Sequence, residues 1–119
     1  MRWLVDGMNL IGSRPDGWWR DRDGAVRRLV GELRAFAERS GDEVCVIFDG
    51  RPVELPADPG PVDVRFSTGR GRDAADDDLA RLAGEGTTVV TSDADLAGRA
   101  RAAGAEVVGA AAFRRRALG

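Results

Sequence analysis

The residues of this sequence best suited to chemistry are aspartates. Four of them, Asp6, Asp49, Asp76 and Asp93, stand where apolar segments begin or end. The 119 residues contain no histidine and no lysine, which excludes a Ser-His-Asp triad, a Schiff base and a P-loop lysine. Carboxylate oxygens are hard ligands, so this chemistry predicts a site for one or two Mg²⁺ or Mn²⁺ ions.

Each of these aspartates also has a simpler interpretation. The pairs Asp6-Gly7 and Asp49-Gly50 are common turn dipeptides, and an acid at the start of a helix can cap it and interact favourably with its dipole. For any single aspartate the simpler interpretation is the better one. The four together favour a metal site, because carboxylates gathered at one place repel each other without a cation.

The elements that must position these acids alternate between strand and helix patterns. Apolar runs and period-two alternation predict strands at residues 3–5, 44–48, 62–66, 88–90 and 107–108, with 62–66 as an edge strand. Helical periodicity predicts helices at 25–39, after an N-cap at Asp73, after Asp93 and at 110–118, and glycines and a proline predict a polar loop over 12–24. We therefore expect one domain over 1–119, a three-layer α/β/α sandwich around a parallel sheet of four to five strands.

In such a sheet, sites form beyond the carboxyl ends of the strands, where the four aspartates would meet. On the helix after Asp73, the buried stripe leaves Asp76 and Asp78 on its two margins and places Asp77 on the far side, so periodicity does not choose between the first two.

Polar neighbours of the acids are candidates for substrate contacts. Asn9, the only side-chain amide in the sequence, could orient the Asp6 carboxylate or bind a phosphate, or it could cap a local turn. Thr91, Ser92 and the helix start at Asp93 could hold a phosphate oxygen or serve only as a cap.

Arginines and tryptophans extend the candidate surface. Arg51, Arg70 and Arg72 lie in loops on the same edge as the acids and could neutralise the backbone phosphates of a nucleic acid, or could simply be solvated. Trp18 and Trp19 sit in an arginine-containing loop, and we expect one to pack on the core and the other to stack on a base. Residues 114–116, three arginines, are expected on a solvated helix face.

The charge balance permits a polyanionic substrate. The formal net charge is −2, yet if five of the 20 acids (Asp6, Asp49, Asp76, Asp93 and Asp95) line a metal pocket, 15 remain against 18 arginines. Cys45 is the only cysteine and is expected in the core, so a reducing cytoplasm is predicted. No apolar run is long enough to cross a bilayer.

Four segments, in order and correctly spaced, resemble the YacP-like NYN domain of the PIN-like nuclease superfamily. They are Trp3 to Gly12 with its Asp-Gly-Met-Asn core, Val46 to Gly50, Ala75 to Leu79 and Val90 to Leu96. Residues 13–22 and the arginine-only composition resemble actinobacterial members.

The resemblance implies a PIN-like fold and divalent-metal-dependent cleavage of RNA. By motif position it places Asp6, Asp49, Asp76 and Asp93 in the metal site, with Asn9, Asp77 and Asp95 close by, and it favours Asp76 over Asp78. Ribosome association is a further expectation from the resemblance. Longer YacP-like proteins continue past the last strand, whereas this sequence stops at Gly119, so a role that depends on that extension is not carried over.

These arguments predict a cytoplasmic, metal-dependent endoribonuclease acting on single-stranded RNA, as a monomer or a homodimer. Its metal ions would bind the scissile phosphate and acidify the attacking water, leaving 5′-phosphate and 3′-hydroxyl ends. The alternatives are a non-catalytic RNA-binding module with a structural ion, a toxin-like PIN nuclease, and a magnesium-dependent phosphatase. The missing lysine argues against the last, because aspartyl-phosphate enzymes use one.

Overall fold

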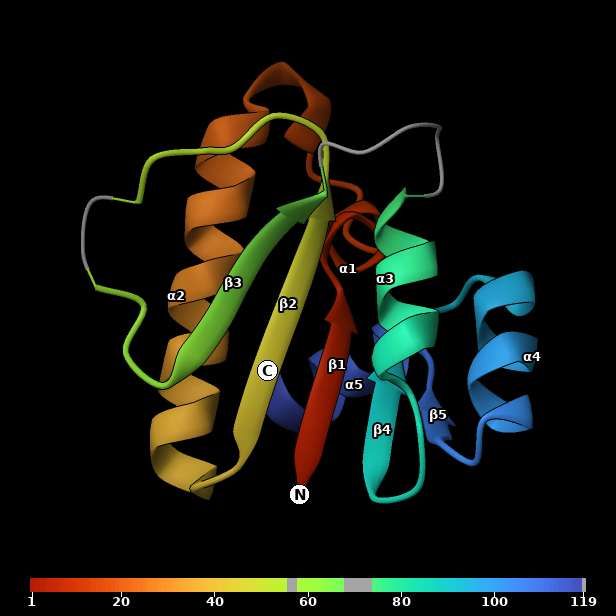
Figure 1. Ribbon diagram of the computed structural model, residues 1–119. Coiled ribbons are helices and arrows are strands. Elements are labelled where there is room, and N and C mark those ends of the chain that lie inside the picture. Colours follow the sequence, from red (N-terminus) through yellow and green to blue (C-terminus); the bar gives the residue numbers. More distant parts are fainter. Residues whose placement is uncertain (56–57, 68–73, 119) are drawn as a thin grey trace.

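The computed structural model describes residues 1–55, 58–67 and 74–118 (Figure 1). Five parallel strands form one sheet in the order β3-β2-β1-β4-β5. The strands are β1 (Arg2–Asp6), β2 (Glu43–Asp49), β3 (Val62–Ser67), β4 (Thr87–Val90) and β5 (Glu106–Val108). The parallel sheet and the edge position of β3 are as the sequence predicts.

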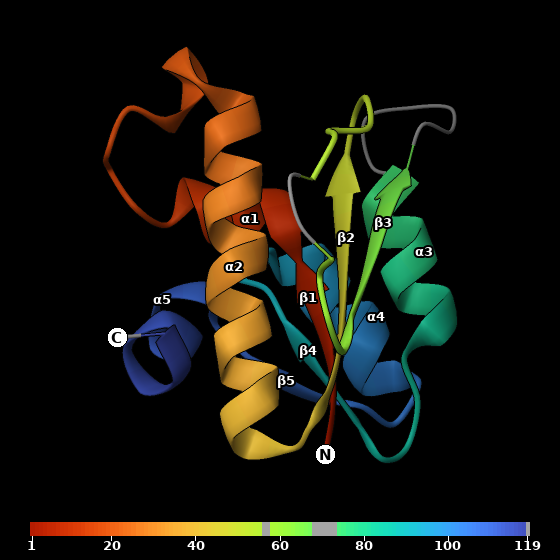
Figure 2. The same cartoon turned by 90° about the vertical axis from the view of Figure 1, so that its left-hand side faces the viewer.

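Helices cover both faces of the sheet, with α1, α2 and α5 on one side and α3 and α4 on the other (Figure 2). The helices are α1 (Gly7–Gly12), α2 (Arg22–Ser40), α3 (Ala74–Leu82), α4 (Ala94–Ala102) and α5 (Ala110–Phe113), with short helical turns η1 (Trp18–Arg20) and η2 (Arg114–Leu118). The result is the predicted three-layer sandwich. In the part of the chain that is described, no helix has the length and apolar character of a membrane span.

Alternation along the central strands divides the core into two layers. Trp3 and Val5 pack toward α2, whereas Leu4 between them packs toward α3 and α4. Strand β2 is buried on both faces in the same way, which explains its continuous apolar sequence. Cys45 lies in the layer beneath α3 and α4, as expected of a core cysteine.

Local signals set the ends of α2, the longest helix of the described residues. The Asp21 carboxylate accepts a hydrogen bond of 3.0 Å from the backbone N–H of Gly24, an N-cap. The helix ends where Gly41 adopts φ +75°, a left-handed conformation that glycine reaches without strain.

Helix α1 lies where the sequence shows no helix signal. It has six residues, begins and ends with glycine, and has no side-chain cap at its N-terminus. Glycine is a weak helix former, so tertiary packing stabilises this helix: Leu10 is fully buried and Ile11 is 4% exposed. The loop is shorter than the predicted 12–24, because it contains η1 and α2 begins at Arg22, three residues before the predicted start of that helix.

Gly7 makes the closest approach between α1 and the sheet. A Cβ atom there would lie 2.4 Å from Cδ1 and 2.5 Å from Cε1 of the fully buried Phe48 ring. Gly7→Ala is therefore expected to lower the free energy of unfolding, measured in urea, by about 1–3 kcal/mol, because the crowded core must shift. Gly12→Ala is the matched control, since no atom lies within 4 Å of a Cβ at that position. Equal effects of the two substitutions would contradict the close approach.

Candidate active site

The site lies where the chain changes direction across the sheet. After β1 the chain adds β2 and β3 on one side and then returns to add β4 and β5 on the other. The carboxyl ends of β1 and β4 therefore meet at a topological switch point, the usual place for a site in an open α/β sheet. Asp6 is the last residue of β1, and Asp93 follows β4 by three residues.

Asp6 is a buried carboxylate, only 5% exposed. Its pKa is raised from the ordinary 3.8 to about 6, chiefly by burial and in smaller part by the negative charges of Asp49 and Asp93. The Thr91 hydroxyl, which donates a 2.9 Å hydrogen bond to Asp6 Oδ2, and the backbone N–H of Asn9 act in the opposite direction. The negative charges of Asp49 and Asp93, the other two acids predicted at strand ends, thus act on the Asp6 carboxylate.

Asp49 connects β2 to the start of α3. Its Oδ1 accepts a 2.9 Å hydrogen bond from the backbone N–H of Ala75, so a carboxylate distant in sequence interacts with the N-terminus of this helix. Arg22 donates a 2.7 Å hydrogen bond to the backbone oxygen of Asp49 and fixes the end of the strand. The expected N-cap, Asp73, lies outside the described residues.

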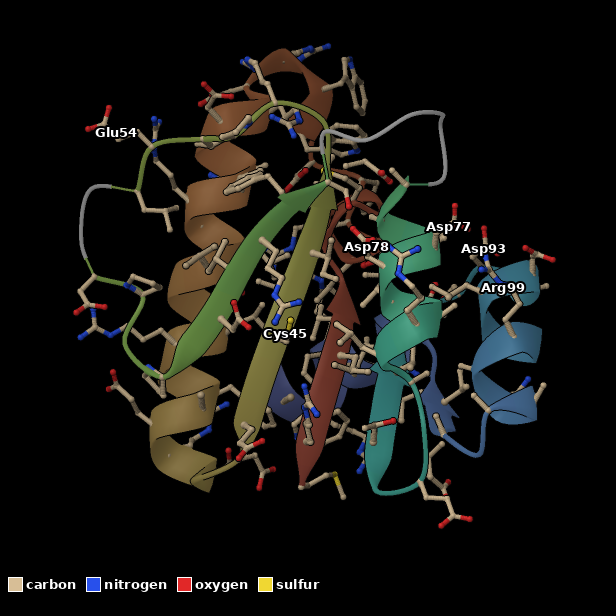
Figure 3. All side chains as sticks on the ribbon, in the orientation of Figure 1. Cys45, Glu54, Asp77, Asp78, Asp93 and Arg99 are labelled. Carbon is tan, nitrogen blue, oxygen red and sulfur yellow. The ribbon has the colours of Figure 1, made fainter. Side chains whose placement is uncertain are left out.

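The three consecutive acids of α3 face different surroundings. Asp76 is half-buried in the first turn, next to Ala75. Asp78 accepts hydrogen bonds from Ser67, at the end of β3, and from Arg81. Asp77 is exposed and forms a 3.0 Å ion pair with Arg99 of α4, so these two side chains bridge the two helices (Figure 3).

Asp93 caps α4, as its simpler interpretation requires. Its Oδ1 accepts a 2.9 Å hydrogen bond from the backbone N–H of Leu96. Its own N–H donates to Thr91 Oγ1 at 3.1 Å, so Thr91 contacts both Asp6 and Asp93. Asp95 is exposed in the first turn of the same helix.

Asn9 joins α1 to the turn that follows β4. Its Oδ1 accepts a 2.8 Å hydrogen bond from the backbone N–H of Ser92, across 83 residues of sequence. Its side chain therefore neither caps a local turn nor bonds to Asp6; its backbone N–H faces that acid instead. The Ser92 hydroxyl oxygen accepts from the N–H of Ala110, which ties α5 to the same turn.

Part of the basic and aromatic surface predicted from the sequence lies within the described residues. Arg51 is exposed and forms a 2.8 Å ion pair with Asp23, while Arg70 and Arg72 lie outside the described residues. Trp18 packs against the core and Trp19 is 63% exposed, which confirms that one tryptophan packs.

Arg114 corrects one prediction, since it does not lie on a solvated face. It donates a 3.0 Å hydrogen bond to the backbone oxygen of Leu10 and lies 3.6 Å from a carboxylate oxygen of Glu32. Burial lowers its pKa, although it remains a guanidinium. Arg115 and Arg116 are exposed, as expected. Position within a run of three arginines gave no signal that the first would turn inward.

The donor atoms of the site suit a hard cation. Oδ1 of Asp49 and Oδ1 of Asp93 each accept a backbone N–H, whereas the Asp6 carboxylate accepts both the Thr91 hydroxyl and the backbone N–H of Asn9. Among the described residues, no three acidic side chains lie close enough to form a ready-made metal cluster, so the structure does not gather the four predicted acids into one ligand set. Mg²⁺ commonly uses one or two carboxylates and retains several waters, which suits acids spaced in this way.

Sequence order could not reveal Thr91 as the partner of Asp6, because 85 residues separate them. The available signal was positional: Thr91 follows β4 directly, at the same edge of the sheet as Asp6. Arg22, which fixes Asp49, has no comparable signal, since it appears in the sequence only as one of several arginines around η1.

The parallel sheet, its switch point and the acids at its carboxyl edge define a PIN-like α/β domain. Residues 3–117 match the family model described as the YacP-like NYN domain, and the chain belongs to this family. The family has a nuclease-type fold associated with nucleic acids.

Relatives and solved structures agree with this assignment. The UPF0178 proteins of Rhodopseudomonas palustris strain BisB18 and of Bradyrhizobium diazoefficiens are each 46% identical to this chain over 77 residues. The matched segment is 65% of this chain, 48% of the Rhodopseudomonas protein and 44% of the Bradyrhizobium protein. The chain thus spans about half the length of these curated relatives.

Two crystal structures of Rae1 (YacP) from Bacillus subtilis, one of a point mutant, superpose on the protein. The mutant has a TM-score of 0.78 and 24% identity, covering 98% of this chain and 74% of its own. The other has a TM-score of 0.74 and 26% identity, covering 98% and 73%. These similarities are to the PIN-like fold predicted from the sequence.

Proposed function

We propose that this protein is a divalent-cation-dependent endoribonuclease that hydrolyses phosphodiester bonds of single-stranded RNA. The observation that carries the proposal is the Asp6 carboxylate, buried at the switch point of the sheet beside Asp49 and Asp93. Burying a carboxylate is unfavourable unless something compensates its charge. Perturbed acids in such positions are typical of functional sites. Membership of a nuclease-type family supports the same conclusion.

The roles of the residues follow from their contacts. Asp6, Asp49, Asp76 and Asp93 would hold Mg²⁺ or Mn²⁺, one or two of them directly and the others through water molecules bound to the ion. The ion would supply positive charge to the scissile phosphate and acidify a water molecule. Thr91, by donating to Oδ2 of Asp6, would fix the orientation of the Asp6 carboxylate. Asp77 and Asp95 are exposed at the starts of α3 and α4, so we assign them an outer electrostatic role.

RNA would approach over the exposed residues at this edge. Arg51 and Trp19 are exposed, and guanidinium groups and indole rings bind phosphates and bases respectively. The chain contains no histidine, so carboxylates and water would carry the protons during hydrolysis.

The test is cleavage of a 5′-labelled single-stranded RNA in Mn²⁺, in Mg²⁺ and in EDTA. We expect metal-dependent cutting that leaves 5′-phosphate and 3′-hydroxyl ends, and a loss of at least about tenfold in Asp6→Asn, because removal of one catalytic group commonly costs that much or more. Asp63→Asn is the matched control, since Asp63 is exposed and pairs with Arg65 on the edge strand.

Two outcomes would contradict the proposal. Cyclic-phosphate products would indicate attack by the ribose hydroxyl and not by water. RNA binding that is equal in wild type and Asp6→Asn, with no cleavage in either, would favour the non-catalytic RNA-binding module. The capping roles of Asp49 and Asp93 are compatible with that alternative.

A further inference from the structure

A pocket of about 420 Å³ opens beside the acids, on the side of the sheet covered by α1 and α5. Its volume is in the range of small-molecule sites. The residues that line it are Met8, Asn9, Gly12, Ser13, Ser92 and Ala111.

The pocket and the acids share two segments of chain. Asn9 donates its backbone N–H to Asp6 and is also one of the residues that line the pocket. Ser92 lines the pocket and directly precedes Asp93. The pocket and the acids are therefore joined through Asn9 and Ser92, as adjoining parts of one nucleotide chain would require.

The walls of the pocket combine apolar surface with directed donors. Met8 is half-buried, and thioethers make favourable contacts with aromatic rings. Gly12 and Ala111 have small side chains, which leave room for a flat group. Because Asn9 Oδ1 accepts from Ser92 N–H, the Asn9 side chain presents its NH₂ group as a donor.

A second donor comes from Ser92, whose hydroxyl oxygen already accepts from Ala110 N–H. Within the described ranges, neither the Ser92 hydroxyl proton nor the Asn9 NH₂ group has an acceptor. The pocket thus offers an apolar surface and two donors to a flat ligand that carries acceptors. Every nucleobase fits this description, so the pocket would select for a base and not for one base type.

We infer that this pocket binds a nucleobase, that of the nucleotide next to the bond cleaved at Asp6, Asp49 and Asp93. The placement of that nucleotide rests on the proposed ribonuclease function, but the binding of a base does not. Adenosine and uridine are suitable probes because they are uncharged, so the acids do not repel them in the absence of metal.

The experiment is a titration of the metal-free protein with adenosine, uridine or ribose, followed by amide chemical shifts. We expect both nucleosides at millimolar concentrations to shift the amides of Gly12, Ser13, Ser92 and Ala111, and ribose to leave them unchanged. Shifts confined to other parts of the chain, no shifts at all, or equal shifts with ribose would each overturn the inference.

Filling the pocket should abolish these shifts. Gly12→Leu adds a side chain where a Cβ meets no atom within 4 Å, and we expect about tenfold weaker nucleoside binding, comparable to the loss of one stacked base. Gly31→Leu is the matched control, because Gly31 is also helical with no atom within 4 Å of a Cβ and lies outside the pocket. Unchanged binding in Gly12→Leu would overturn the inference.

Ala111→Leu provides a second filling variant from a different helix, should Gly12→Leu not fold. The two proposals fail independently. Chemical-shift changes in the pocket on adding nucleoside, without RNA cleavage, would support the base-binding pocket and contradict the proposed nuclease function. RNA cleavage without chemical-shift changes in the pocket would support the nuclease function and contradict the base-binding pocket.

Discussion

Asp6→Asn should raise the free energy of unfolding of the metal-free protein by about 3 kcal/mol at neutral pH. The pKa of Asp6 is about 6 in the folded protein, against an ordinary 3.8, chiefly because the carboxylate is buried. Between these two values the folded state keeps a proton that the unfolded state has lost. The free energy of unfolding of the wild type therefore falls as pH rises through this window, and the penalty is complete above it.

An amide at residue 6 does not ionise, so it escapes this penalty. The difference in unfolding free energy between Asp6→Asn and wild type should accordingly be small at pH 3.8 and grow to its full size above pH 6. Urea unfolding in EDTA at a series of pH values measures it. Asp95→Asn, which removes an exposed carboxylate from the same edge, controls for the change in net charge.

Divalent metal should reverse the order of stability. A cation that binds the folded wild type stabilises it in proportion to the logarithm of metal concentration, whereas Asp6→Asn lacks one of the proposed ligands. We expect Mn²⁺ to raise the wild-type unfolding midpoint and to have little effect on the variant. If the difference in unfolding free energy between wild type and Asp6→Asn did not change with pH, the pKa of Asp6 would not be raised by burial and by neighbouring acids.

Phe113→Ala is expected to destabilise the protein by about 3–5 kcal/mol, the usual cost of removing a buried phenylalanine ring. Phe113 is 1% exposed. Its ring centroid lies 5.1 Å from that of Trp3 in β1 and 5.4 Å from that of Phe36 in α2. The substitution would thus leave a cavity where α5, α2 and the sheet meet.

Phe66→Ala is the matched control, because Phe66 stacks on Phe48 with centroids 5.4 Å apart but is only half-buried on the edge strand. A smaller loss in urea unfolding is expected there. Phe113→Ala should also weaken nucleoside binding in the pocket, since Ala111 lies on the same short helix. Equal losses in the two variants would show that Phe113 is not a central contact.

The sequence predicted the elements whose signals are local. Strand β2 shows a continuous apolar run, and α2 has a repeating apolar face and a stop at Gly41, although its start at Arg22 after the Asp21 cap lies three residues before the predicted one. Helix α1 could not be predicted in this way, because Gly7 and Gly12 disfavour helix and only packing of Leu10 and Ile11 compensates. Local sequence signals therefore predicted the three-layer arrangement but not helix α1, which contributes to the site.

For the site, the sequence placed the acids at the correct edge but could not give their partners. Asp6 and Asp49 end adjacent strands, as expected from the strand pattern. The contacts of Thr91 with Asp6 and of Ala75 with Asp49 depend on how distant segments meet in space. The same holds for Arg114, whose inward turn depends on α1 and Glu32.

The hydrogen bond between Thr91 and Asp6 also bears on the order of folding. It joins residues 85 positions apart, and contacts that close such long loops carry a large entropic cost and slow folding. A chain made only as far as α3 contains Asp6 and Asp49 but neither Thr91 nor Asp93. We therefore expect the Asp6 carboxylate to lack its Thr91 partner, and to be more hydrated, until β4 joins the sheet.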